Sequence, residues 1–146
     1  MAVISTGEIL VVDLVGHLIR NICFDRQFVA MRAYENLLVV IYHESVPIEG
    51  SQCLAMSMFV VDRMTKEILQ ISCSHLPITP HSVLKSFFFS SEGMLFSQDS
   101  TGQMRVYSLQ TNEWSKVYLK NTTDPRRVWM VGVSNYVLHF WKTTDL

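Results

Sequence analysis

The chain has 146 residues, the size of one domain or of a piece of one, and it is long enough to bury a hydrophobic core. Hydrophobic residues make up 49% of the sequence and charged residues only 17%, which argues against a disordered chain. The 12 Lys and Arg residues against 13 Asp and Glu residues give a net charge of −1, which excludes a strongly basic nucleic-acid binder.

Cysteine usage and hydropathy bear on the compartment. The three cysteines are Cys23, Cys53 and Cys73. Their odd number and the lack of a C-x-x-C pair argue against a secreted disulfide framework, so we expect reduced, partly buried thiols in an intracellular protein. Residues Met1–Leu10 lack a basic segment, and no signal peptide is predicted. The longest apolar run, Leu37–Tyr42, is far shorter than the roughly 20 residues of a membrane span, so no membrane contact is expected.

Short runs rich in Val, Ile, Phe, Tyr and Thr alternate with clusters of turn residues, a pattern typical of β-strands. Strands are expected at residues 8–14, 17–24, 28–34, 36–44, 53–61, 66–73, 83–90, 94–99, 103–109, 114–119, 127–133 and 136–142. No stretch of ten or more residues has a convincing helical period with caps, so the sequence predicts an all-β fold. Within strand 36–44, alternation predicts that Val39 and Ile41, or else Val40 and Tyr42, face a packed core.

An internal repeat indicates the architecture. Ser5–Gly7 and Ser100–Gly102 carry the same Ser-Thr-Gly turn at an offset of 95 residues, and apolar residues follow both in step. Two units in that span give about 47 residues each, close to a four-stranded propeller blade. The alternative is that any two β-hairpins look alike.

The predicted fold class is an incomplete β-propeller of WD40-like four-stranded antiparallel blades, with about three blades in this chain. The expected division is residues 1–24 as the end of one blade, 28–73 and 83–119 as full blades, and 127–142 as the start of another. The first segment would hold two strands from residue 8 to 24, and the blade 28–73 would carry an insert at Ser45–Gln52.

No catalytic, cofactor-binding or metal-binding residue is predicted. The histidines are His17, His43, His75, His81 and His139. Cys73, His75 and His81 come closest to metal-ligand spacing, but no second ligand pair follows, so we expect loop or core residues there. Nucleophile, phosphate-loop and zinc-protease motifs are absent from the sequence, and no enzyme activity is expected.

Two further groups of side chains have both a functional and a structural interpretation. Asp124–Arg127 with Trp129, preceded by Lys116 and Lys120, could contact phosphate and stack on a base, but a solvated loop is favoured at this net charge. The remaining aromatic candidates are Phe87–Phe89, Trp114 and Trp141, and these with Trp129 are expected to pack between blades. Asp99–Gly102 and Asp62–Arg63 are expected to be turn residues that bond nearby backbone N–H groups.

Several short sequence segments resemble those of one protein family. They are Asn36–His43, Gly50–Leu54, Leu76–Thr79, Ser82–Phe89, Asn112–Trp114 and Arg127–Val133. In order and spacing they resemble the middle (SepB-type) β-propeller of the replisome hub family, which comprises chromosome transmission fidelity factor four, acidic nucleoplasmic DNA-binding protein one and the minichromosome loss protein. The resemblance spans nearly the whole chain.

This resemblance implies a nuclear, non-enzymatic scaffold at the replication fork that links the replicative helicase to DNA polymerase alpha. In the family the middle propeller forms a trimer, and a following helical bundle docks the partner peptides. Here only about half of that propeller is present and no helical segment follows Leu146, so the docking surface is expected to be absent. No partner-binding residue is carried over. The alternative function is a propeller fragment of an unrelated interaction protein, and a third is a small β enzyme or metal-binding domain.

Self-association follows from the incomplete ring. Its two uncovered flanks are expected to expose apolar side chains and open strand edges. Two chains of three blades could close a six-blade ring as a dimer, or could pair less regularly through their edges, while the resemblance implies a trimer. A weaker alternative is that another segment of the same parent protein supplies the other blades.

Overall fold

The computed structural model describes residues 2–5, 7–62, 64–118 and 128–142. Within these residues the chain contains only strands and turns, and every strand pair is antiparallel. The first sheet has the order β1 (Ala2–Ser5), β2 (Glu8–Val12), β3 (Leu18–Cys23). The second has the order β4 (Phe28–Tyr34), β5 (Leu37–Ile48), β6 (Ser51–Val61), β7 (Ile68–Leu76). The third has the order β8 (Leu84–Phe89), β9 (Leu95–Asp99), β10 (Met104–Ser108), β11 (Glu113–Val117), and a final hairpin pairs β12 (Val128–Ser134) with β13 (Val137–Lys142).

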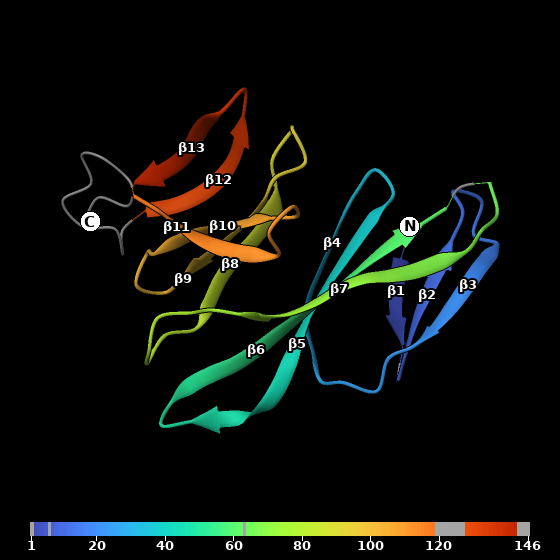
Figure 1. The fold of residues 1–146 in the computed structure, drawn as a ribbon, viewed down its shortest axis with the longest axis horizontal. Helices are drawn as coiled ribbons and strands as arrows, with labels where there is room; N and C mark the ends of the chain where they lie inside the picture. Colours follow the sequence, from blue (N-terminus) through green and yellow to red (C-terminus); the bar gives the residue numbers. More distant parts are fainter. Residues whose placement is uncertain (1, 6, 63, 119–127, 143–146) are drawn as a thin grey trace.

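The sheets stack in chain order, each packing one face on the next (Figure 1). Three apolar clusters hold the stack together. The cluster between the first and second sheets contains Ile9, Val11, Phe24, Leu38, Val40, Tyr42, Ala55 and Phe59. The cluster between the second and third contains Val39, Ile41, Leu54, Met56, Met58, Leu76, Phe87, Leu95 and Tyr107. Phe96, Met104, Met130 and Val133 join the third sheet to the hairpin.

The first strands of successive sheets also lie together, since β8 contacts both β4 and β12. The predicted fold class is therefore confirmed, as an all-β chain of propeller-like sheets that do not close a ring in the described residues.

Strand β5 is buried on both faces. Val39 and Ile41 lie in the cluster toward the third sheet, whereas Val40 and Tyr42 lie in the cluster toward the first. The two alternatives that alternation offered are thus both correct, because a sheet in the middle of a stack has no solvent face.

The structure corrects two expected boundaries. The first segment holds three strands rather than two, because Ala2–Ser5 pairs with Glu8–Val11. The expected insert at Ser45–Gln52 is a continuation of the β5–β6 hairpin, which turns at Glu49 and Gly50 with φ of 49° and 77°. Pro47 is tolerated because the pairing of β4 with β5 ends at Tyr42, followed by one bond from the His43 N–H to the Gln27 carbonyl at 2.8 Å. Beyond His43 that edge of β5 has no partner strand among the described residues.

The internal repeat has a structural counterpart. At the offset of 95 residues, β2 corresponds to β10 and β3 to β11, and Gly7 and Gly102 both have positive φ, 78° and 85°. The turn between the paired strands needs this left-handed backbone, which glycine adopts without steric cost. The assignment of residues 1–24, 28–73, 83–119 and 127–142 to separate blades of one ring stays a proposal.

One buried amide fixes the final hairpin to the third sheet. The Gln98 side chain donates from Nε2 to the Val128 carbonyl at 2.9 Å and accepts from the Met130 N–H at 3.2 Å. The amide thus satisfies two polar groups of the β12 backbone at a junction where no strand pairing occurs.

Candidate protein-interaction surfaces

The outer face of the final hairpin is exposed and carries apolar side chains on either side of His139. Val131 and Val137 are 58% and 56% exposed, and Trp141 is 73% exposed. The β4–β5 hairpin of the second sheet is equivalent to this β12–β13 hairpin. On β5, alternate positions after the turn are held by Leu37, Val39 and Ile41, and Val39 and Ile41 are fully buried beneath the third sheet. On β13 Val137 holds the position of the half-buried Leu37, His139 that of Val39 and Trp141 that of Ile41, and none of the three has a covering sheet among the described residues. The expectation that Trp141 packs between blades is therefore wrong, and this hairpin face (Val131, Val137 and Trp141) is a candidate contact surface.

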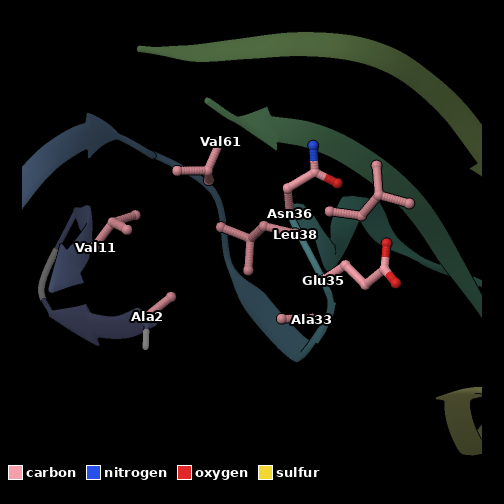
Figure 2. Close-up of a pocket in the computed structure, with 8 residues that line it drawn as sticks. Ala2, Val11, Ala33, Glu35, Asn36, Leu38 and Val61 are labelled. Atoms are coloured by element: carbon pink, nitrogen blue, oxygen red, sulfur yellow. The ribbon is translucent and has the colours of Figure 1, made fainter. Parts of the chain in front are cut away.

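A small apolar pocket lies beside the first strand. Ala2 and Val11 form one wall, and Ala33, Glu35, Asn36 and Leu38 form the other, as Figure 2 shows. The pocket has a volume of about 130 Å³. Ala2 and Val11 are directly paired across β1 and β2, so the pocket lies over the face of the first sheet that packs on the second sheet.

A larger polar cavity of about 600 Å³ opens between the first and second sheets. The Tyr42 hydroxyl lies 3.3 Å from Cys73 Sγ, and Arg26 stacks over the Tyr42 ring at 5.9 Å. Burial raises the pKa of Tyr42, and its contact with the Cys73 thiol raises it further. Cys23 also lines the cavity. Cys23 and Cys73 are exposed, whereas the sequence predicted partly buried thiols; only Cys53 has that intermediate exposure.

A buried ion pair lies at the Asp99–Gly102 turn. Arg105 Nη1 donates to Asp99 Oδ2 at 2.8 Å, and the Thr79 hydroxyl donates to the same oxygen at 2.7 Å. The Thr101 and Gln103 N–H groups donate to Oδ1 at 3.1 and 3.2 Å, so the predicted turn bonding of Asp99 is confirmed. Burial opposes ionisation, but the bonds from Thr101, Thr79 and Arg105 outweigh it and lower the pKa of Asp99 to about 2. The cluster pins the β7–β8 connection to the third sheet and leaves no free group for chemistry.

Sequence reasoning missed Thr79 and Arg105 as partners of Asp99. The available signal was Arg105, a charged residue between Met104 and Val106 in a short strand. The other predicted turn acid, Asp62, accepts from the Met64 and Thr65 N–H groups at 2.7 and 3.0 Å, as expected.

The histidines are dispersed. His75 contacts Glu44 at 3.2 Å, and the backbone N–H of His81 donates to the Ser51 hydroxyl at 2.8 Å. His17 contacts Asp13, and His139 contacts Ser134. Within the described part of the chain, no three His, Cys, Asp or Glu side chains gather closely enough to hold a metal ion.

The other aromatic candidates pack as expected where they are described. Phe87 lies in the cluster between the second and third sheets and Phe89 packs against it, whereas Phe88 packs against the cluster that joins the final hairpin. The Trp114 ring lies against the Tyr107 ring at a tilt, with the ring centroids 5.1 Å apart. The basic segment Asp124–Arg127 and Lys120 lie outside the described residues, as does the side chain of Trp129. Lys116 is exposed on β11. No helix in residues 2–5, 7–62, 64–118 and 128–142 is long and apolar enough to cross a membrane.

Comparison with known proteins identifies the family to which this chain belongs. A family model described as "Minichromosome loss protein, Mcl1, middle region" matches residues 1–143. The WD repeat and HMG-box DNA-binding protein 1 of Mus musculus is 27% identical over 139 residues, which are 90% of this chain and 12% of that protein. The Homo sapiens protein of the same name is 29% identical over 111 residues, 72% of this chain and 10% of its own length. The Protein ENHANCER OF LHP1 1 of Arabidopsis thaliana is 28% identical over 113 residues, 75% of this chain and 11% of that protein. The chain thus spans only about a tenth of these relatives, and the resemblance found in the sequence is confirmed: the chain belongs to the family of the minichromosome loss protein middle region.

Proposed function

We propose that this chain is a segment of a non-enzymatic scaffold of the DNA replication fork, which acts in the nucleus through protein contacts. Its support is the family match over residues 1–143 together with relatives whose names describe WD-repeat, DNA-binding proteins. The proposal that the chain acts through protein contacts rests on the hairpin face. Val137 and Trp141 are exposed there, whereas the equivalent Leu37 and Ile41 of β5 pack under the third sheet. The alternative of an unrelated interaction protein loses its basis with the family match.

Self-association through the hairpin face belongs to this proposal. The first sheet has three strands and the final hairpin two, so joining them across two chains would not give a four-stranded blade. A dimer that closes a six-blade ring is therefore disfavoured by strand count, and we favour the trimer implied by the family. In such an assembly the hairpin face would be a buried, apolar contact.

Linkage of the replicative helicase to DNA polymerase alpha is proposed only for the parent scaffold, not for this chain. DNA contact is proposed only as a secondary property, since the basic segment that could mediate it lies outside the described residues.

Affinity purification of the epitope-tagged parent protein from replicating cells tests this function. We expect the helicase and the polymerase to co-purify with it. We also expect recovery to fall in the Trp141→Ser variant, because docked partners are lost when the scaffold dissociates. A Met64→Ser variant should keep full recovery, because Met64 is exposed in the turn between β6 and β7. Recovery of neither partner with the unaltered protein would overturn the proposed function.

A further inference from the structure

Hairpin turns from successive sheets lie on the same side of the stack. The β4–β5, β8–β9 and β12–β13 turns are at the top of Figure 1. They contact one another, because the Tyr34 hydroxyl donates to the Ser91 carbonyl at 3.0 Å and the Ser91 N–H donates to the Val133 carbonyl at 3.0 Å. The β6–β7 turn adjoins them, since the Val61 N–H donates to the Asn36 carbonyl at 2.8 Å. We call the surface formed by these turns, together with the β10–β11 turn, the turn face.

An apolar cavity of about 400 Å³ opens on the turn face at the β8–β9 and β10–β11 turns. Its apolar lining consists of Phe89, Met94, Leu95, Val106 and Leu109 of the third sheet and Met58 of the second. Leu109 is 46% exposed, so the cavity meets solvent along this side chain. An apolar side chain of a partner would be removed from water there, which favours binding.

A second cavity, of about 560 Å³, lies on the turn face at the second sheet, and we call it the acidic cavity. Glu35 of the β4–β5 turn and Asp62 of the β6–β7 turn line it. Neither carboxylate forms an ion pair with a described residue. The acidic cavity therefore holds two negative charges that a cationic side chain of a partner can neutralise.

Tyr34 separates the two cavities. Its ring centroid lies 5.6 Å from that of Phe89, and a Cβ on Gly93 would lie 2.6 Å from its Cε1, so Tyr34 borders the apolar cavity. The next residue in the chain, Glu35, lines the acidic cavity. A short extended segment that crosses Tyr34 can thus place an apolar side chain in one cavity and a neighbouring side chain in the other.

The charge of the turn face decides which kind of partner fits. Its acidic residues are Glu35, Asp62, Glu67 and Glu92, and its basic residues are Arg63 and Lys66. None of the four acids forms an ion pair within the described part of the chain. An acidic surface attracts Lys and Arg side chains and repels the phosphates of a nucleic acid. A second copy that met this surface with its own turn face would bring like charges together, so a basic segment of another protein is the better match.

We propose that the turn face binds a basic, extended segment of a partner protein, with an apolar side chain in the apolar cavity and a Lys or Arg side chain in the acidic cavity. The apolar side chain supplies affinity, and the charges orient the segment and exclude acidic ones. Glu35 has φ of 52°, a left-handed backbone that Asn adopts more readily than Glu, so the turn itself does not explain the carboxylate. This surface deepens the proposed scaffold function, and its biological meaning rests on that function.

Fluorescence anisotropy with the labelled peptide Ser-Gly-Leu-Lys-Arg-Lys-Gly-Ser tests the proposal on the full chain. We expect saturable binding that weakens as the salt concentration rises. Replacing the Leu of the peptide by Gly should weaken binding, because the apolar cavity is then left unfilled. Replacing its Lys and Arg residues by Glu should abolish binding, because these side chains would meet the acidic cavity with like charge.

Variants of the chain test each cavity separately. The double variant Glu35→Asn and Asp62→Asn should weaken binding about tenfold, since it removes both charges while Asn suits the left-handed backbone at 35 and still accepts N–H bonds at 62. Glu49→Asn is the matched control, because this exposed residue has φ of 49° but belongs to the β5–β6 turn and lines neither cavity. Leu109→Ser should also weaken binding, whereas Leu14→Ser, at an exposed turn residue of the first sheet, should leave it unchanged. Unchanged urea midpoints would show that these variants are folded.

The proposal would be overturned if the unaltered chain did not bind the basic peptide, if the acidic peptide bound equally, or if Glu49→Asn weakened binding as much as the double variant. Amide exchange at residues 34–36 that slows with chain concentration, without peptide, would assign the cavities to a second copy and overturn it too. The peptide experiment does not depend on recovery of the helicase or the polymerase, so failure of this site and failure of the scaffold function can be told apart.

Discussion

Among the described ion pairs, Asp99–Arg105 is the only one removed from water, with Asp99 fully buried and Arg105 4% exposed. Removing one partner of such a pair leaves the other charge buried without compensation. We expect Asp99→Ala to lower the free energy of unfolding by about 3–5 kcal/mol in urea titrations. Asp62→Ala is the matched control, since that exposed carboxylate also accepts from backbone N–H groups and its removal should cost clearly less than that of Asp99. Equal losses in the two variants would contradict a special role for the buried pair.

The carboxylate of Asp99 also makes the stability of the fold depend on pH. The pKa of Asp99 is lowered to about 2 in the folded state, below the value of 3.8 for a free aspartate. Its contribution to stability is therefore complete above about pH 4 and is lost as the pH falls toward 2. Comparing urea midpoints of the unaltered chain and of Asp99→Asn should show a gap that narrows over this interval. A gap that stays constant from pH 6 to about pH 2 would show that ionisation of Asp99 does not stabilise the fold.

Ile41 tests the packing between the second and third sheets. Its side chain is fully buried between the second and third sheets, so truncation to Ala removes methyl groups and leaves a cavity. We expect a loss of about 2–5 kcal/mol in the free energy of unfolding. Val46→Ala on the same strand should cost less than about 0.5 kcal/mol, because Val46 is 80% exposed. A similarly small loss for Ile41→Ala would refute the stacked core.

At the scale of elements, the turn after β8 is a junction between sheets. Gly93 has φ of 81°, and a Cβ there would lie 2.6 Å from Cε1 of Tyr34 on the second sheet. Gly7 has φ of 78°, but a Cβ there would have no neighbouring atom within 4 Å, so this position isolates the backbone cost. We expect Gly7→Ala to cost about 1–2 kcal/mol and Gly93→Ala to cost clearly more, measured by thermal or urea unfolding.

A double variant identifies the source of the extra cost. Tyr34→Ala removes the ring that the new methyl group would meet, so the penalty of Gly93→Ala should shrink toward that of Gly7→Ala in the Tyr34→Ala background. An unchanged penalty would mean that the β8–β9 turn is strained for reasons unrelated to the neighbouring sheet.

The elements themselves could be predicted because strand alternation and turn residues are local signals. Ala2–Ser5 could not be predicted as a strand, since four residues are too few to show a period, and its identity depends on pairing with β2. The Asp99 cluster could not be derived, because Thr79 is 20 residues away and only the packing of two sheets brings it near. The size and apolar character of Trp141 predict a core position, but whether a sheet covers it is a property of the assembly rather than of the strand.

At the scale of the whole molecule, the two ends of the stack differ. At the first sheet the unfilled feature is a strand edge, where hydrogen-bonding groups of β1 have no described partner strand. At the final hairpin it is a face, where apolar side chains have no covering sheet in the described residues. An open edge is completed by an extended segment and an open face by another sheet, so the two ends differ in the kind of element that would complete them.

The hairpin face carries the prediction for the assembled state. Sedimentation of the purified chain at micromolar concentration should show a multimer, because a second copy that covers Val137 and Trp141 removes their exposed apolar surface from water. The double variant Val137→Ser and Trp141→Ser should sediment as a monomer with an unchanged urea midpoint, since neither side chain packs inside the stack. Met64→Ser is the control, because Met64 is 90% exposed in the turn between β6 and β7, and its replacement should leave the multimer intact. A monomeric unaltered chain would refute self-association. A multimer that survives the double variant would place the contact elsewhere, with the open edge of β1 as the next surface to alter.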